Sequence, residues 1–289
     1  MILRLREREL DLSQPVLMGI VNATPDSFSD RQGPKAVDEL AVRALRLVEE
    51  GAAIVDLGGE SGRTDTEAVP VDVEAGRVVP LVERLAREGV LVSVDTWRGP
   101  VARAALEAGA AMINDVSGLS DADVGAACAA TGASLVVTHT RAAPKTKAFP
   151  RYDDVVADVC AFLEERLGVA RAAGVAEEAI VLDPGIDLAK TPAESIELLR
   201  RLPDFAPLGR PLLLAVSRKD FVGALTERPP AARDAGTLAA VGAAVRGGAR
   251  IIRVHDVAGA RDYLRVHEAL AEGADRALEL ATELKREAV

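Results

Sequence analysis

Amide and ionisable side chains recur along this chain directly after short apolar runs. Each run is rich in Val, Ile and Leu and stops at a polar residue, as a buried strand does where it leaves a sheet. Strands with a purely structural role could end in Gly, Ser or Thr, although some of these polar groups could cap helices or pair with each other. So many of them together favour one shared site. They are Asn22, Glu60, Arg63, Asp95, Asn114, Asp115, His139, Asp183, Arg218, Lys219, Arg253, His255 and Asp256.

One part of this set is cationic. Arg63, Arg253 and His255 could hold a phosphate-like anion, the arginines through paired hydrogen bonds to its oxygens. Asn22 adds an uncharged oxygen, which suits Mg²⁺ because this ion takes few protein ligands and completes its shell with substrate phosphates.

The other part mixes hydrogen-bond donors and acceptors, and it consists of Asp95, Asn114, Asp183 and Lys219. Carboxylates that face an amide suit a flat heterocycle with N–H edges and a carbonyl. We therefore expect an anion-and-metal corner beside a heterocycle slot.

The elements that must position these groups can be read from the same pattern. The apolar runs predict strands at Val16–Val21, Ala53–Leu57, Val90–Val94, Ala111–Val116, Ser134–Thr138, Ala179–Leu182, Pro211–Val216 and Arg250–Val254. Between them, apolar residues at a 3.6-residue period predict helices. Among these are Lys35–Glu50, Asp72–Arg87, Tyr152–Ala173, Pro192–Arg201 and Arg233–Gly247.

Eight β-α units in 289 residues predict an α/β protein, a single-domain TIM (β/α)8 barrel spanning residues 1–289. The main alternative is a doubly wound open sheet, which is disfavoured because no GxGxxG motif follows the first strand. Residues 1–15 precede that strand and are expected to cover the bottom of the barrel. Barrel enzymes carry their catalytic residues at the carboxyl ends of the strands, so the polar groups should meet on one rim.

Composition narrows the possible partners. The formal net charge of −10 argues against binding to nucleic acid or to an anionic membrane surface. Cys128 and Cys160 lie in no CxxC or Cys/His cluster, which predicts free thiols and no zinc site. The N-terminus is too charged for a signal peptide and no apolar run reaches the roughly 20 residues of a membrane span, so a cytoplasmic protein is expected.

Several ordered motifs resemble one known family. Met18–Asp30, which reads MGIVNATPDSFSD, closely resembles the first signature of the dihydropteroate synthases, and Ile54–Arg63, IVDLGGESGR, resembles their second. Further matches are Ser93–Thr96, Ile113–Asp115, Leu182–Gly185, Ser217–Lys219 and Arg253–Asp256. The resemblance extends from about residue 15 to residue 270.

The resemblance implies a barrel that joins 6-hydroxymethyl-7,8-dihydropterin pyrophosphate to p-aminobenzoate. The products would be 7,8-dihydropteroate and pyrophosphate, in a step of folate biosynthesis that sulfonamides target. Carried over by position, the pterin would be held by Asp95, Asn114, Asp183 and Lys219. The pyrophosphate would be held by Asn22, Arg63, Arg253 and His255, with Asn22 also binding Mg²⁺. Catalytic roles would fall to Asp95, Lys219, Arg253 and His255, in a homodimer formed through the last helices.

Three departures from the family pattern concern p-aminobenzoate. Gly62 replaces the threonine of the usual Ser-Thr-Arg-Pro-Gly loop, and Asp187 and Leu188 stand where alternating glycines and a phenylalanine are usual. The family serine at a helix start, which binds the p-aminobenzoate carboxylate, is Asp220 here. Asp220 either repels that carboxylate or caps its helix and points elsewhere. Two hypotheses follow: a working synthase with an adapted amine site, and a diverged pterin-binding paralogue that does not condense p-aminobenzoate.

Two less favoured hypotheses lie outside the family. A Schiff-base aldolase would use Lys219 as its nucleophile, but neighbouring carboxylates should keep that lysine charged. A folate-dependent methyltransferase barrel would share the pterin slot without needing the pyrophosphate corner.

Overall fold

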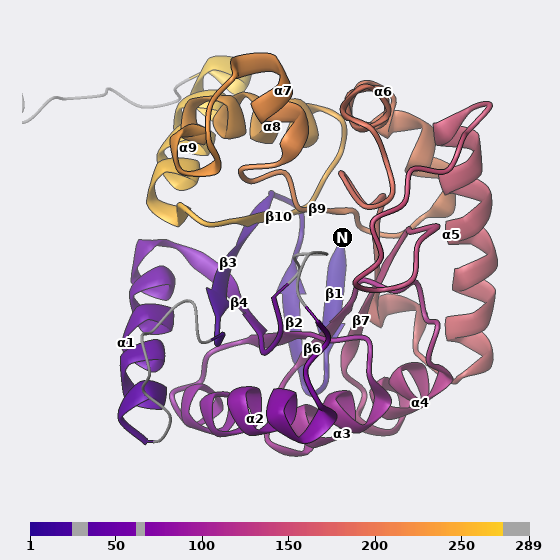
Figure 1. Cartoon of the computed structure of the whole chain (residues 1–289). Coiled ribbons are helices and arrows are strands. Elements are labelled where there is room, and N and C mark those ends of the chain that lie inside the picture. Colours follow the sequence, from indigo (N-terminus) through magenta and orange to yellow (C-terminus); the bar gives the residue numbers. More distant parts are fainter. Residues whose placement is uncertain (25–33, 62–66, 274–289) are drawn as a thin grey trace, which may run out of the picture.

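The computed structural model describes residues 1–24, 34–61 and 67–273 (Figure 1). Eight parallel strands form a closed barrel. They are β3 (Val16–Asn22), β4 (Ala52–Gly58), β5 (Val92–Asp95), β6 (Met112–Asp115), β7 (Ser134–Thr138), β8 (Ile180–Asp183), β9 (Leu213–Leu214) and β10 (Ile251–Val254). Neighbours pair in the order β8-β7-β6-β5-β4-β3-β10-β9, and a parallel bridge from Leu182 to Leu212 closes the ring. The predicted TIM barrel is therefore confirmed.

Helices surround this barrel on its outer face (Figure 1). They are α1 (Pro34–Glu50), α2 (Val71–Arg87), α3 (Gly99–Glu107), α4 (Ala122–Thr131), α5 (Val155–Ala172), α6 (Pro192–Arg200), α7 (Asp220–Thr226), α8 (Asp234–Arg246) and α9 (Val257–Glu272). Short 3-10 helices lie at Glu177–Ala179, Leu202–Leu208 and Pro230–Ala232. None of the described helices is both long and apolar enough to cross a membrane.

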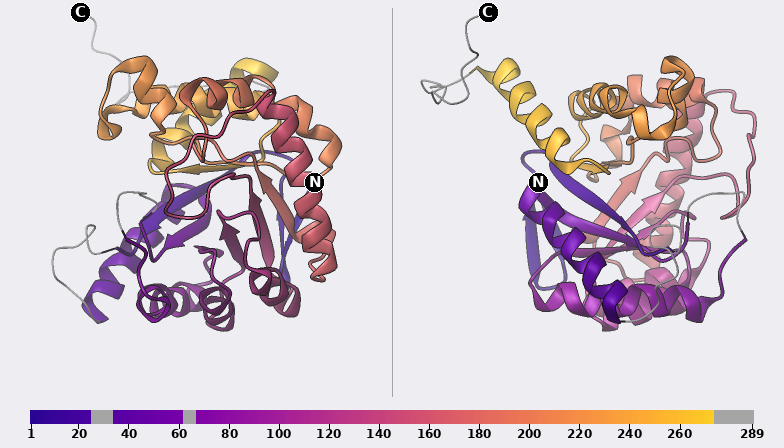
Figure 2. Two further views of the ribbon diagram at one scale, coloured as in Figure 1. Left: turned by 45° about the vertical axis from the view of Figure 1, so that its right-hand side comes forward. Right: turned by 60° about the vertical axis from the view of Figure 1, so that its left-hand side comes forward.

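An antiparallel hairpin of β1 (Ile2–Leu5) and β2 (Arg8–Asp11) precedes the barrel and lies at one end of it (Figure 2). Leu3, Leu5 and Leu12 of this region are buried in one cluster with inward-facing strand residues such as Met18 and Ile54. Burying these side chains keeps water out of the amino-terminal end of the barrel. The opposite end is left for a site.

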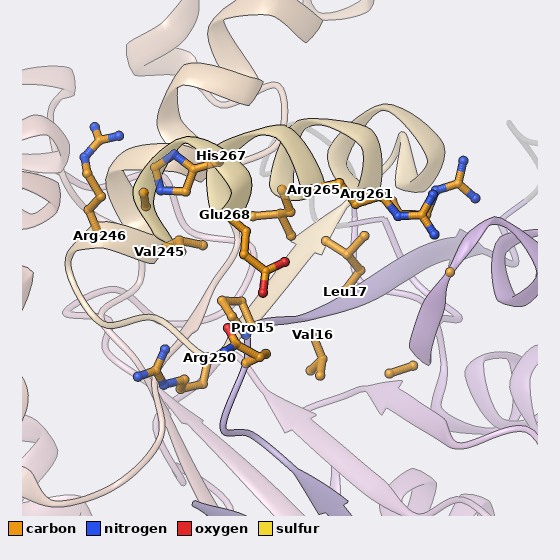
Figure 3. Close-up of a pocket in the computed structure, with 15 residues that line it drawn as sticks. Pro15, Val16, Leu17, Val245, Arg246, Arg250, Arg261, Arg265, His267 and Glu268 are labelled. Carbon is orange, nitrogen blue, oxygen red and sulfur yellow. The ribbon is translucent and has the colours of Figure 1, made fainter. Parts of the chain in front are cut away.

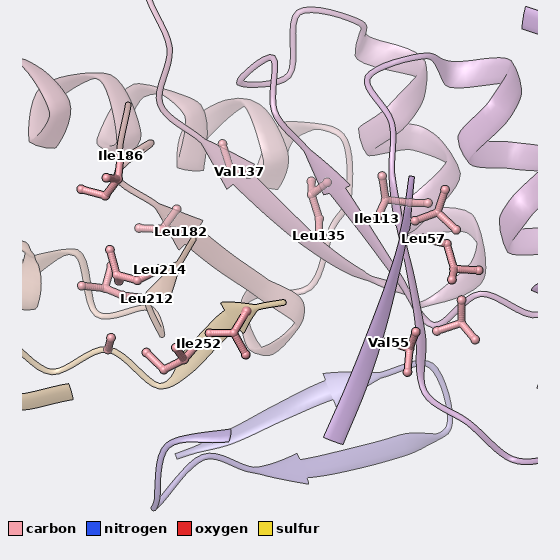
Figure 4. Close-up of a cluster of buried hydrophobic side chains, with 14 of the residues drawn as sticks. Val55, Leu57, Ile113, Leu135, Val137, Leu182, Ile186, Leu212, Leu214 and Ile252 are labelled. Atoms are coloured by element: carbon pink, nitrogen blue, oxygen red, sulfur yellow. The ribbon is translucent and has the colours of Figure 1, made fainter. Parts of the chain in front are cut away.

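A second and larger apolar cluster lies between the barrel wall and the helices (Figure 4). Val55 and Leu57 belong to it, whereas Ile54 between them belongs to the hairpin cluster. Alternate residues of one strand therefore serve the two cores, as the two-residue period of a strand requires.

The predicted elements agree with the structure to within a few residues. The seventh strand shrinks from Pro211–Val216 to Leu213–Leu214. Pro211, which has no N–H to donate, lies outside the strand. Its carbonyl instead accepts a hydrogen bond from Leu182 N at 3.0 Å. Helix α5 begins at Val155 because the Asp154 carboxylate caps it, accepting from two backbone N–H groups of its first turn. Both cysteines are free thiols, as expected.

Candidate active site

A cavity of about 620 Å³ opens at the carboxyl ends of the strands. The residues singled out in the sequence that line it are Glu60, Asp95, Asn114, Asp183, Asp187, Leu188, Arg218, Lys219, Asp220 and Arg253. His255 follows β10 directly, and Asn22 ends β3 beside Gly58 of β4. Arg63 and Gly62 lie outside the described residues. Segments more than 150 residues apart in sequence thus meet at one rim, as the barrel topology requires.

The centre of the site is a carboxylate that the sequence reasoning did not single out. Asp56, wholly buried on β4, accepts hydrogen bonds from Arg253 Nε at 2.7 Å and from Asn114 Nδ2 at 3.1 Å. Arg253 Nη2 also donates to Asp95 Oδ2 at 3.1 Å. The signal for Asp56 was an acidic residue inside an otherwise apolar strand, which must face a cation or an amide to be buried.

Asp95 is an unusual acid in this network. Burial raises its pKa to about 7, although Arg253 opposes the rise and the Asp56 carboxylate adds to it. A carboxyl group with such a pKa exchanges its proton near neutral pH, which suits a role in proton handling or in matching the charge of a bound ring.

Asn114 and Asp183 supply the acceptors of the slot. Because Asn114 donates its Nδ2 to Asp56, its Oδ1 is buried without a partner among the described residues. Asp183 is buried at the end of β8 and accepts from Gly185 N at 2.7 Å through Oδ1. Burial raises the pKa of Asp183, and Lys219 and Lys190 oppose that rise. These acceptors fit a ligand edge that presents N–H groups.

Beside Arg253, His255 forms a second polar corner. Its Nδ1 lies 2.9 Å from Ser217 Oγ, which holds the ring in place. Burial, together with the nearby cations Arg218 and Arg253, lowers the pKa of His255 to about 4. So many positive neighbours around one imidazole suit a site that receives an anion.

Behind the slot, Lys190 holds the loop between β8 and α6. Its ammonium is buried and donates to the carbonyls of Gly185 at 2.8 Å and Leu188 at 2.9 Å. It also lies 2.8 Å from His139 Nδ1, while His139 Nε2 lies 3.2 Å from Asp158 Oδ1. This geometry requires Nε2 to carry the imidazole proton. Burial lowers the pKa of Lys190 to about 7, opposed by Asp183.

Asp187 and Ala189 of the same loop adopt left-handed conformations with φ of 64° and 52°, which are strained for residues with a side chain. The bonds of Lys190 to this loop offset that strain. The sequence Ala189–Thr191 did not indicate that Lys190 holds this loop, because a lysine just before a helix is also compatible with a solvent-exposed side chain.

A second cavity, of about 460 Å³, lies at the amino ends of the strands between α8, α9 and β3 (Figure 3). Arg246, Arg250 and Arg265 line it together with Glu268 and apolar residues such as Leu17. It contains no buried acid or buried amide, so it lacks the chemistry of the first cavity.

Comparisons with known proteins agree with this geometry. Residues 18–255 match the model of the family described as "Pterin binding enzyme". The dihydropteroate synthase of Escherichia coli K12 is 41% identical over 262 residues, which cover 90% of this chain and 93% of that protein. The chain belongs to the dihydropteroate synthase family.

Solved structures of the family have the same fold. A Xanthomonas albilineans dihydropteroate synthase with 4-aminobenzoic acid superposes with a TM-score of 0.87 at 43% identity, covering 94% of this chain and 99% of that chain. The same synthase in complex with 7,8-dihydropteroate gives a TM-score of 0.85 at 42% identity, covering 94% and 99%. The resemblance predicted from the motifs is confirmed.

The family departure at Asp220 takes an unexpected form. Helix α7 begins at Asp220, but its carboxylate makes no capping bond, is 85% exposed and pairs with Arg233 at 3.2 Å. Of the two alternatives for Asp220, capping of its helix is therefore wrong, although the side chain does point elsewhere. The carboxylate of Asp187 accepts the backbone N–H of Asp220 instead and is held by Ser195 Oγ at 3.0 Å.

Asn22 is the residue that could take part in metal binding. The described residues contain no group of three or more His, Cys, Asp or Glu side chains able to hold an ion by themselves. A single amide oxygen fits Mg²⁺ only when the substrate supplies most of the other ligands. Gly58 lies beside this oxygen, and a Cβ at that position would be 3.5 Å from Asn22 Oδ1.

Proposed function

We propose that this protein condenses 6-hydroxymethyl-7,8-dihydropterin pyrophosphate with p-aminobenzoate to give 7,8-dihydropteroate and pyrophosphate. It is a transferase of folate biosynthesis. The observation that carries the proposal is the convergence of Asp95, Asn114 and Asp183 with two cations, Lys219 and Arg253, on one cavity. The complexes of the Xanthomonas synthase with 4-aminobenzoic acid and with 7,8-dihydropteroate support it.

The first step is binding of the pterin ring. Asn114 Oδ1 and the Asp183 carboxylate accept its N–H groups, and the Lys219 ammonium donates to its carbonyl oxygen. Because these groups are fixed at strand ends and buried, they pay little ordering entropy when the ring binds.

The second step breaks the bond between the methylene carbon and the pyrophosphate oxygen. The electron pair leaves with the oxygen, where Arg253 and His255 stabilise the new negative charge. An anion beside His255 would also raise its pKa, so that the imidazole can donate a proton. The carboxylate of Asp95 stabilises the positive charge that remains on the pterin methylene. The amine nitrogen of p-aminobenzoate then bonds to that carbon and releases one proton.

Three further properties belong to this proposal. Asn22 would help to hold Mg²⁺, which when bound would supply positive charge beside the pyrophosphate. A homodimer would form through the face of α8, whose many Ala and Gly residues permit close packing. The protein would work in the cytoplasm.

The test is an incubation with the pterin pyrophosphate, p-aminobenzoate and Mg²⁺, in which pyrophosphate and 7,8-dihydropteroate are measured in parallel. We expect the two products in equal amounts. One observation favours the alternative that this chain is a diverged pterin-binding paralogue. The Asp187 carboxylate accepts a hydrogen bond from the backbone N–H of Asp220 at the start of α7. Tight binding of the pterin pyrophosphate without any dihydropteroate would support that paralogue. No binding of the pterin pyrophosphate would refute both.

A further inference from the structure

The turn that carries Asp183 is held against the end of β7. The carbonyl of Asp183 accepts a hydrogen bond from the backbone N–H of His139 at 2.9 Å, and its Oδ1 accepts one from Gly185 N at 2.7 Å. Gly185 has a φ of 71°, and a Cβ there would clash with the His139 carbonyl oxygen, so glycine permits this close approach. The other carboxylate oxygen, Oδ2, has no hydrogen-bond partner among the described residues, which leaves it for a ligand.

The ammonium of Lys190 uses all its N–H groups inside the protein. It donates to the carbonyls of Gly185 at 2.8 Å and Leu188 at 2.9 Å, and it lies 2.8 Å from His139 Nδ1. An ammonium has three N–H groups and accepts nothing, so these three partners exhaust it. Lys190 is among the residues that line the cavity, but no N–H remains for a substrate. It can therefore act on a ligand only through the groups that it holds.

His139 can accept the bond from Lys190 in only one protonation state. Its Nδ1 must be without a proton, and the proton on Nε2 then faces Asp158 Oδ1 at 3.2 Å. Burial, together with the nearby charge of Lys190, lowers the pKa of His139 to about 3, so the ring is neutral. The carboxylate of Asp158 stands on α5 and is 31% exposed. A continuous chain of hydrogen bonds thus leads from the protein surface to the Asp183 turn.

We propose that Lys190, His139 and Asp158 form a positioning relay that sets how tightly the active site holds the pterin ring, by fixing the turn that carries Asp183. The inference rests on the proposed function, in which Asp183 accepts N–H groups of the pterin. The three are positioning residues, since they act through Asp183 and not on the reacting atoms. Because the relay ends at this turn, it should affect the ring and leave the anion corner after β10 unchanged.

The test measures the affinities of 6-hydroxymethyl-7,8-dihydropterin and of inorganic pyrophosphate separately, by isothermal titration calorimetry. Lys190→Met should weaken binding of the pterin about tenfold, while binding of pyrophosphate stays within about twofold. A protein that is only less stable would not separate the two ligands in this way.

The surface end of the relay gives a second variant, at a partly exposed position where folding is less at risk. Asp158→Ala should weaken pterin binding about three- to fivefold, less than Lys190→Met because Lys190 keeps its two carbonyl partners. Asp158→Asn should restore the affinity to within about twofold of wild type, since its amide oxygen can still accept from His139 Nε2. Arg141→Ala is the matched control. It removes the other partner of Asp158, two hydrogen bonds of 3.0 Å, and should change neither affinity.

A spectroscopic measurement examines the relay without any ligand. The chain has three histidines, so the ¹⁵N ring signals of His139 can be assigned readily. At pH 7 the wild-type spectrum should show a neutral His139 ring with its proton on Nε2. The Nδ1 signal should move in Lys190→Met, which removes its hydrogen-bond donor, and stay in place in Arg141→Ala.

Three results would overturn the relay. They are equal weakening of pterin and pyrophosphate binding, unchanged pterin binding in both Lys190→Met and Asp158→Ala, and a proton on Nδ1 of His139 in wild type. Failure of the proposed function gives a different result, because wild type itself would then not bind the pterin or would form no dihydropteroate.

Discussion

The two halves of the active-site cavity are built in different ways. In the pterin half, Asp56, Asp95, Asn114 and Arg253 stand on strands and bond to one another. In the acceptor half, which the family pattern places around Asp187 and the start of α7, the groups stand on or next to loops, and the Asp220 side chain is largely exposed. Strand ends are held by the barrel core, whereas loops change with little effect on folding. This difference explains why the family departures at Asp187 and Asp220 leave the pterin half intact.

Removing a charged group should also cost more in the pterin half than in the acceptor half. Removing one partner from a buried charge network leaves the others desolvated and unpaired. In the acceptor half, exposed charges are screened by water, and single changes there cost less. The substitutions below test this contrast, starting with the change of largest expected effect.

Asp183→Ala should weaken binding of 6-hydroxymethyl-7,8-dihydropterin pyrophosphate by about 100-fold or more. The carboxylate is buried in the slot, and charge-assisted hydrogen bonds to a ligand are each worth about 1.5–3 kcal/mol. Isothermal titration calorimetry measures the change. Asp204→Ala, an exposed acid outside the cavity, serves as the control. Affinity within a few fold of wild type would place the pterin elsewhere.

Asp56→Asn should lower kcat by about tenfold and the free energy of unfolding by about 2–3 kcal/mol, because Arg253 would lose a charged partner in a buried site. Urea denaturation and steady-state kinetics measure the two effects. The matched control is Asp38→Asn on the exposed face of α1, which should change neither. Unchanged stability in Asp56→Asn would show that Arg253 needs no anion there.

Lys190→Met should lower the free energy of unfolding at pH 7 by about 1–2 kcal/mol, because the acceptors in the β8–α6 loop lose their donor. Its pH dependence is a second readout. Burial lowers the pKa of Lys190 to about 7 in the folded protein, from an ordinary value of 10.5. Between these values the unfolded chain binds the extra proton, so wild-type stability rises with pH.

The stability difference between wild type and Lys190→Met should therefore widen from pH 7 to pH 9.5. Parallel denaturation curves at these two pH values measure it. A constant difference would mean that Lys190 keeps its proton from pH 7 to pH 9.5. Lys190 would then hold the β8–α6 loop as a charged ammonium over this whole range.

The barrel strands and most of the cavity-lining groups at their ends follow from the residue pattern. The strands were predictable because buried parallel strands read as apolar runs, and their ends gave Asp95, Asn114, Asp183, Lys219 and Arg253, all of which line one cavity. Asp56 was missed because it lies inside a strand and not at its end. Reading alternate strand positions for polar residues would have found it.

The loop residues could not be predicted in the same way. The role of Lys190 depends on left-handed backbone at Asp187 and Ala189, which no periodic pattern encodes. The contact from Asp187 to the Asp220 amide joins two loops 33 residues apart. Pairing between loops follows from the packing of the whole barrel, so sequence alone gave only the list of unusual residues.

The smallest expected effects separate two acidic residues of the acceptor half. Asp187→Gly removes the carboxylate from the α7 amide and also relieves the left-handed backbone, since glycine adopts a φ of 64° freely. It should lower the KM for p-aminobenzoate about three- to fivefold by removing a repelling charge. Asp220→Ser should change that KM by less than about twofold, because the Asp220 carboxylate is exposed and already paired with Arg233. Steady-state kinetics at low and high salt measures both. If Asp220→Ser gives the larger gain, the repulsion comes from Asp220 after all, and the Asp187 contact is only structural.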